Sequence, residues 1–143
     1  MSDDQAVRAA NTALYDAFET GDIDLMGSLW LDDPADDVMC VHPGWLPVHG
    51  RSAVLRSWSV IMANTSYIQF VLTDVQVRVA GDVAVVTCGE NMLTGLPPTV
   101  ADPSPGLAGG RAVATNVFRR TATGWHLWMH HASPVLATQE DSP

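Results

Sequence analysis

The spacing of apolar side chains divides the chain into two parts. In the first part, apolar residues recur every three or four positions, which is the period of an amphipathic helix. The pattern predicts a helix over about residues 4–20, a short second helix capped by Asp22, and a third helix capped by Ser52. Gly21 separates the first two helices, as a glycine just beyond a helix C-terminus does. A short apolar run over residues 38–42 predicts a strand before the third helix.

From Tyr67 onward the period changes to two, which is typical of strands. The pattern predicts four long strands, over residues 67–79, 83–93, 111–120 and 125–133. A two-residue turn at Thr123-Gly124 would join the last two strands. The segment from Gly95 to Gly110 is rich in glycine and proline and lacks periodicity, so it is predicted to be a long loop. Helices followed by consecutive strands indicate an α+β domain, with helices packed on one face of an antiparallel sheet.

Length and charge limit the classes of function. A chain of 143 residues is expected to form a single domain, which we assign to residues 1–138 with a disordered tail over 139–143. Hydrophobic residues make up 47% of the chain, which indicates a globular protein. The formal net charge of -9, with 7 Lys and Arg, argues against nucleic acid and anionic membranes as partners, because both attract basic surfaces.

The ends and the cysteines favour a cytoplasmic protein. The first residues show neither a basic segment nor the apolar segment of a secretory signal, and no apolar run is long enough to span a membrane. Cys40 and Cys88 lack the spacing of a metal site and are expected to be free thiols. We therefore expect a cytoplasmic location.

The segment from Val41 to Arg51 is the first candidate for a functional site. His42 stands where the short strand ends, and Trp45 follows in a loop that contains two prolines and a glycine. Loops at the ends of rigid elements commonly carry binding and catalytic residues. The ordinary histidine pKa near 6.5 suits proton transfer at neutral pH.

The order of elements and several motifs resemble those of the nuclear transport factor 2-like (NTF2-like) superfamily, and within it the SnoaL-like and ketosteroid isomerase-like proteins. The matching segments are Tyr15 to Leu29, Val38 to Arg51, Gly81 to Val86, Ala114 to Arg120, Gly124-Trp125, and His130 to Ser133. The resemblance implies a cone-shaped, curved antiparallel sheet wrapped around three N-terminal helices, the cystatin-like α+β roll. It also implies an apolar pocket for a small hydrophobic ligand and a homodimer.

The resemblance also implies positions for the site residues. His42 falls where ketosteroid isomerases carry a general-base aspartate, and Asn116 falls where they carry an oxyanion-binding acid. Their oxyanion-binding tyrosine has no clean counterpart, because Leu14 takes its place and Tyr15 is one residue away. One residue is about 100° around a helix, so Tyr15 is expected to point elsewhere.

The predicted turn at Thr123-Gly124 would place Asn116 opposite His131 on the neighbouring strand. Asn116, His131 and Ser133 would then share the face that the resemblance assigns to the pocket, and His130 would face away. The expected apolar walls are Trp30, Trp45, Trp58 and Phe118.

Glu90, an acid in the middle of a strand, is expected to pair with Arg111 or Arg119 across the sheet. A metal site of His42, His131 and Glu90 is an alternative, which would require all three to face inward. The sequence lacks the common metal, nucleotide and serine-hydrolase motifs, so we expect neither a metal nor a cofactor.

These observations support two kinds of function. In the first, His42 moves a proton, Asn116 stabilises an enolate, and His131 assists, in a cofactor-free isomerisation, cyclisation or dehydration of a carbonyl compound. In the second, the chain is a non-catalytic module for ligand binding or dimerisation, in which the histidines are ordinary buried residues and Asn116 ties two strands together.

Overall fold

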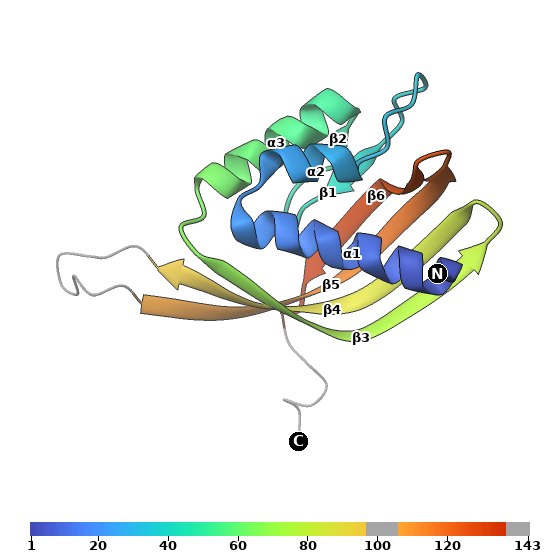
Figure 1. Cartoon of the computed structure of the whole chain (residues 1–143). Coiled ribbons are helices and arrows are strands. Elements are labelled where there is room, and N and C mark those ends of the chain that lie inside the picture. Colours follow the sequence, from blue (N-terminus) through green and yellow to red (C-terminus); the bar gives the residue numbers. More distant parts are fainter. Residues whose placement is uncertain (97–105, 137–143) are drawn as a thin grey trace.

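The computed structural model describes residues 1–96 and 106–136, and it shows helices packed on one face of a curved sheet (Figure 1). The helices are α1 (Asp3–Thr20), α2 (Ile23–Leu29) and α3 (Arg51–Ala63). The strands are β1 (Met39–Val41), β2 (Val48–His49), β3 (Ile68–Ala80), β4 (Val83–Leu96), β5 (Gly106–Thr121) and β6 (Gly124–Pro134). The predicted α+β fold, a curved sheet around three helices, is confirmed.

The sheet has the strand order β2-β1-β6-β5-β4-β3. The four long strands form an antiparallel meander, and β1 pairs with β6 in parallel, with Cys40 beside His130. This parallel pairing places the end of β1, and therefore His42, beside the second half of β6.

Local sequence signals define the ends of the helices. Ser2 and Gln5 form a reciprocal capping box at the start of α1, and Gly21 ends α1 in the left-handed conformation with φ of 66°. Asp22 caps α2, as predicted. The predicted capping of α3 by Ser52 is wrong, because Gly50 holds that position and the Asp36 carboxylate accepts a hydrogen bond from the Arg51 backbone N–H instead.

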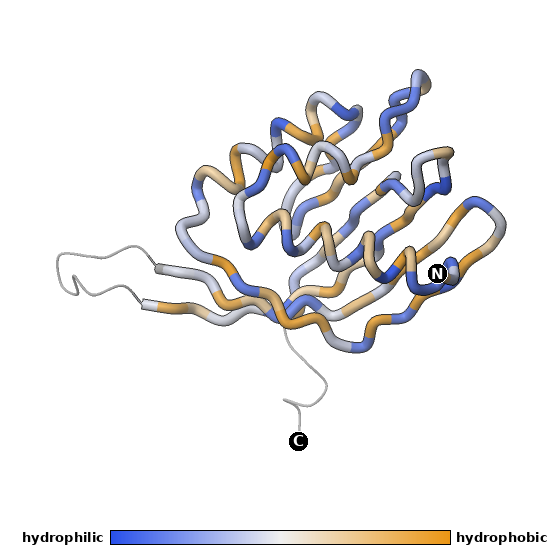
Figure 2. Tube along the Cα trace, in the orientation of Figure 1, coloured by the Kyte–Doolittle hydropathy of each residue, from blue (hydrophilic) through white to orange (hydrophobic). Residues whose placement is uncertain are grey.

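The core lies between the helices and the sheet. Figure 2 shows apolar and polar residues alternating along the strands, as a sheet with one covered face requires. The largest fully buried side chains include Trp30, Phe118, Leu14 and Met26. No helix in the described ranges, 1–96 and 106–136, is long and apolar enough to cross a membrane.

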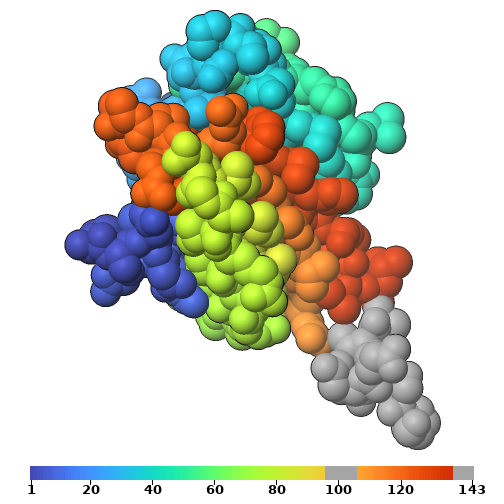
Figure 3. All heavy atoms as spheres, turned by 90° about the vertical axis from the view of Figure 1, so that its right-hand side faces the viewer, coloured from blue at the N-terminus to red at the C-terminus, as the bar shows by residue number. Residues whose placement is uncertain are grey.

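Arg120 connects three segments at one end of the molecule. Its guanidinium donates hydrogen bonds to the carboxylates of Asp3 and Asp82 and lies over the ring of Trp125. Figure 3 views this end, where the start of α1 lies near the β3–β4 and β5–β6 turns. The large cavity described below lies toward the other end, beside the second half of α1.

Strands β4 and β5 continue into the predicted loop. Leu96 pairs with Gly106, so the prediction of a loop from Gly95 to Gly110 is wrong at both ends. The rest of that loop, residues 97–105, lies outside the described residues, and so does the predicted tail over 139–143.

The β5–β6 hairpin differs in register from the prediction. Thr121 pairs with Gly124, so the turn residues are Ala122 and Thr123. This turn moves the pairing by two positions relative to the prediction. A β-bulge then leaves Trp128 unpaired, which shifts the pairing back by one residue for the rest of β6.

The net shift of one residue inverts the predicted facing of β6. Asn116 pairs with His130, and both are buried against the helices. His131 pairs with Thr115 and is exposed on the outer face of the sheet, as is Ser133. The predicted pairing of Asn116 with His131 is therefore wrong, as is the placement of His131 and Ser133 in a pocket.

Candidate functional site

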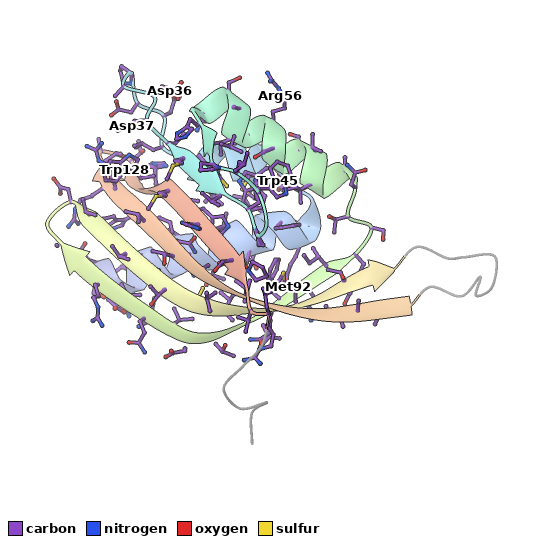
Figure 4. The ribbon with its side chains drawn as sticks, turned by 180° about the vertical axis from the view of Figure 1, so that it is seen from behind. Asp36, Asp37, Trp45, Arg56, Met92 and Trp128 are labelled. Carbon is purple, nitrogen blue, oxygen red and sulfur yellow. The ribbon has the colours of Figure 1, made fainter. Side chains whose placement is uncertain are left out.

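An apolar cavity of about 270 Å³ lies between the helices and the inner face of the sheet. It is lined by Leu14, Tyr15, Phe18, His42, Pro43, Trp45, Trp58, Ile61, Ile68, Phe70, Glu90, Met92 and His130. Figure 4 labels two of these residues, Trp45 on the loop after β1 and Met92 on β4. Trp45 is 44% exposed, so its ring lies at the boundary between the cavity and solvent.

His42 is held by packing and by one strong hydrogen bond. Its ring is 3% exposed and lies edge-on to Trp45 and Trp58. The Ser57 hydroxyl donates its only hydrogen to the Val54 carbonyl oxygen at 2.6 Å, so it can only accept from His42 Nε2–H, at 2.8 Å. Burial lowers the pKa of His42 to about 4. His42 is therefore neutral at pH 7 and carries its lone pair on Nδ1.

Glu90 and Tyr15 form a buried pair within the cavity wall. The Tyr15 hydroxyl donates to Glu90 Oε2 at 2.6 Å, and the Glu90 side chain is 3% exposed. Burial raises the pKa of Glu90, and the hydrogen bond from Tyr15 acts in the opposite direction. Burial and the neighbouring Glu90 also raise the pKa of Tyr15, so its hydroxyl keeps its proton at neutral pH.

Two sequence predictions are therefore wrong at this pair. Tyr15 points into the cavity, not away from it, and Glu90 faces inward to Tyr15, not across the sheet to Arg111 or Arg119. Inward facing follows from the register, in which Glu90 pairs with the buried Ala112.

Asn116 lies behind the cavity wall and uses its whole amide group. Its Nδ2 donates to Asn11 Oδ1 at 2.8 Å and to the Tyr15 hydroxyl at 3.2 Å. Its Oδ1 accepts from His130 Nδ1. Both amide hydrogens are thus occupied by the protein, so the side chain holds Tyr15 and His130 in position.

The hydrogen bond to Asn116 defines the state of His130. Because Nδ1 carries the proton, the neutral ring has its lone pair on Nε2. Burial lowers the pKa of His130 to about 3, and the nearby His42 and His131 act in the same direction. The ring lines the cavity, 6.4 Å between centroids from His42.

Some of the predicted site residues line the cavity, and others lie in the core or on the outer face of the sheet. His42, Trp45 and Trp58 line the cavity together. Trp30 and Phe118 are not among its lining residues, because both are 1% exposed within the hydrophobic core.

Among the polar residues of the cavity, Tyr15 and His130 were not predicted, and Glu90 was expected to face inward only in the metal alternative. Glu90 carried a signal, because an acid in the middle of an apolar strand is unusual. The facing of His130 depends on the register of β6, and the direction of the Tyr15 side chain depends on the rotation of α1 about its axis.

The cavity combines a carboxyl group with two neutral imidazoles in apolar surroundings. Burial raises the pKa of the Glu90 carboxyl toward neutral pH, which favours proton exchange with a bound molecule, whereas the two histidines have lowered pKa values and are neutral there. Within residues 1–96 and 106–136, no cluster of three His, Cys, Asp or Glu could hold a metal ion. The side chains of His42, His131 and Glu90 do not come together as metal ligands, because His131 faces the outer side of the sheet.

Comparison with known proteins relates this geometry to a family. Residues 7–137 match the model of the SnoaL-like domain. A solved structure from Streptomyces avermitilis, described as a candidate dehydratase of the NTF2-like family, is 58% identical, with a TM-score of 0.87 over 94% of this chain and 97% of that one. One from Thiobacillus denitrificans, described as a candidate calcium/calmodulin-dependent protein kinase type II association domain, is 33% identical, with a TM-score of 0.74 over 90% of this chain and 94% of that one.

The F-box protein SKIP8 of Arabidopsis thaliana is 26% identical over 132 residues, which are 92% of this chain. The chain spans about half of that protein, 51% of its length. The family model covers most of the chain, and the arrangement of helices and strands is shared with the 58% identical NTF2-like protein. The chain therefore belongs to the SnoaL-like domain family, within the NTF2-like proteins.

Proposed function

We propose that the protein binds a small hydrophobic carbonyl compound in the cavity and catalyses a cofactor-free proton transfer on it. The reaction would be an isomerisation, a cyclisation or a dehydration. The observation that carries this proposal is the buried Glu90 carboxyl, which lines an apolar cavity together with two neutral histidines. The description of the 58% identical Streptomyces protein as a candidate dehydratase supports the same class of chemistry.

Glu90 is the better base than His42. Burial raises the pKa of Glu90, which strengthens its carboxylate as a base, whereas burial lowers the pKa of His42. In a dehydration, the carboxylate takes a proton from the carbon beside the carbonyl. The C–H electron pair then forms a C=C bond as the C–O bond of the β-hydroxyl breaks. The proton on Glu90 passes to the departing oxygen, and water leaves.

His42 and Asn116 take other parts in this scheme. His42 Nδ1 would accept a hydrogen bond from a substrate hydroxyl and orient it. Asn116 positions Tyr15, which in turn holds the Glu90 carboxyl. It does not donate to an enolate, since both its amide hydrogens are occupied.

A second function, ligand binding without turnover, is favoured by one observation. The ring N–H groups of His42 and His130 both donate to protein oxygens, so neither histidine offers an N–H to a developing oxyanion.

Hydrogen exchange separates the two functions. We would incubate 2-tetralone, a bicyclic ketone, with the protein in D2O and follow the loss of its α-hydrogen signals by proton NMR. Turnover predicts faster exchange with the wild type, and a reduction of 10²-fold or more in the Glu90→Gln variant. Asp16→Asn removes an exposed acid of α1 outside the cavity and should exchange like the wild type. Binding of the ketone without any acceleration would support the second function.

A further inference from the structure

We infer that the cavity selects neutral, bicyclic ligands that carry hydroxyl groups and rejects carboxylates of the same shape. The basis is that three polar residues of the cavity lining, His42, Glu90 and His130, each keep a hydrogen-bond acceptor that no strong donor among the described residues occupies. The inference rests on the proposed function, because it names the class of molecule that the same cavity takes.

The acceptor on His42 follows from a chain of hydrogen bonds. Ser57 gives its hydrogen to the Val54 carbonyl, so His42 must donate from Nε2, and Nδ1 keeps a lone pair. Among the described residues, Nδ1 has one hydrogen-bond contact, the Cys40 sulfur at 3.8 Å, which is a long contact for a weak donor. A ligand hydroxyl can therefore supply the missing hydrogen.

The acceptor on His130 follows from its pairing with Asn116. The amide oxygen of Asn116 takes the Nδ1 hydrogen, because the amide nitrogen is occupied by Asn11 and Tyr15. His130 Nε2 then carries a lone pair and has no hydrogen-bond partner among residues 1–96 and 106–136. His42, just after β1, and His130, on β6, thus present the same kind of atom.

Glu90 adds the third acceptor and, among the described lining residues, the only acidic side chain. Its Oε2 accepts from Tyr15, and its Oε1 has no protein partner in the described part of the chain. The lining residues within 1–96 and 106–136 include no Lys or Arg, so a ligand carboxylate or phosphate would meet a carboxyl and two lone pairs without a compensating cation. The Trp58 indole N–H has no hydrogen-bond partner among the described residues, but it is buried beside the Cys40 thiol and is not accessible from the cavity.

The size and shape of the cavity indicate a bicyclic ligand. A cavity of roughly 150 Å³ holds one benzene ring, and this one measures about 270 Å³. The rings of Phe18, Phe70 and Trp58 contact one another edge to face and form a wall for a flat apolar body. Hydroxyl groups on such a body would meet Glu90, His42 and His130.

Three naphthalene probes of nearly equal shape test this inference. 2-Naphthol carries a donor, 2-methoxynaphthalene lacks it, and 2-naphthoate is an anion. We expect wild-type protein at pH 7 to bind 2-naphthol at least tenfold more tightly than 2-methoxynaphthalene, with 2-naphthoate the weakest, by isothermal titration calorimetry. Glu90→Gln, which removes the charge and adds an amide donor, should raise the affinity for 2-naphthoate at least tenfold. Asp16→Asn should leave all three affinities unchanged.

The outcomes separate the inference from the proposed function. Equal binding of 2-naphthol and 2-methoxynaphthalene, or tightest binding of 2-naphthoate, would overturn the inference and leave the cavity as a ligand site. Failure of all three probes to bind would overturn the inference and the proposed function together. The three-ligand comparison uses wild-type protein alone, so it stands even if Glu90→Gln does not fold.

Discussion

His42 and His130 lie beside a buried carboxyl group, and burial shifts the pKa values of these groups in opposite directions. In each case burial disfavours the charged form, so the histidines lose their proton more easily and Glu90 holds it more firmly. Burial therefore makes each of the three groups harder to charge than it would be in water.

The two histidines should show opposite tautomers. We expect nitrogen-15 NMR to find the proton on Nε2 of His42 and on Nδ1 of His130, and neither ring to become charged above about pH 5. Replacement of Asn116 by Leu should release the His130 proton from Nδ1, while the His42 tautomer stays unchanged. Titration of either ring near its ordinary pKa of 6.5 would contradict the burial described here.

His42 should also make the stability of the protein depend on pH. Its pKa is lowered on folding, so the unfolded chain binds the proton more tightly, and the free energy of unfolding falls as pH drops below about 6.5. Between pH 7 and pH 4.5 this loss is about 2 kcal/mol. Glu90 acts in the opposite direction, because its raised pKa favours folding as pH falls.

Urea unfolding at several pH values measures the loss. His42→Asn should reduce the dependence between pH 7 and pH 4.5, since asparagine does not titrate, and the remaining dependence should reflect His130, whose pKa is also lowered on folding. An unchanged slope in the variant would assign the pH dependence to other groups.

Among the elements, β6 shows where sequence reasoning reaches its limit. Periodicity predicted the helices and the long strands, because each depends on residues close in the chain. The facing of β6 depended on the hairpin turn and on the bulge at Trp128, and a difference of one residue exchanged His130 with His131. His42 and Trp45 were placed correctly in the cavity wall because they follow the end of β1, whatever the register.

Strands β3 and β4 are in close contact at Gly89. A Cβ atom at this position would lie 2.5 Å from Thr73 Oγ1, which is too close for any side chain without a shift. We expect Gly89→Ala to lower the free energy of unfolding by about 1–2 kcal/mol, as overpacking does. Chemical denaturation would measure this change.

A second substitution tests the cause. In a Thr73→Ala background the clash is removed, so the cost of Gly89→Ala should fall by at least half. An equal cost in both backgrounds would show that the backbone of β4, and not the Thr73 hydroxyl, sets the limit.

On the scale of the whole molecule, the helices cover one face of the sheet and leave the other open (Figure 1). Val71 and Val113 are 61% and 52% exposed, and His131 and Ser133 share the outer face of the sheet with them. We propose that a second copy of the chain covers this face and forms the expected homodimer.

Sedimentation equilibrium tests the dimer. The wild type should sediment at twice the mass of the chain, and Val113→Glu should shift the equilibrium toward the monomer by placing a charge in the apolar interface. Val60→Glu is the matched control, because Val60 is 49% exposed on α3, on the helical side of the molecule. A monomeric wild type, or equal effects of both substitutions, would contradict the proposal.

The hydrogen-bonded row of Glu90, Tyr15, Asn116 and His130 joins side chains from α1, β4, β5 and β6. Each hydrogen bond in this row joins two buried side chains that lie far apart in the sequence. Replacing one of these residues would leave a buried polar group of its partner without a hydrogen bond. We therefore expect substitutions at these positions to occur together during evolution. Across related sequences, these four positions should therefore covary as a set, even where overall similarity is low.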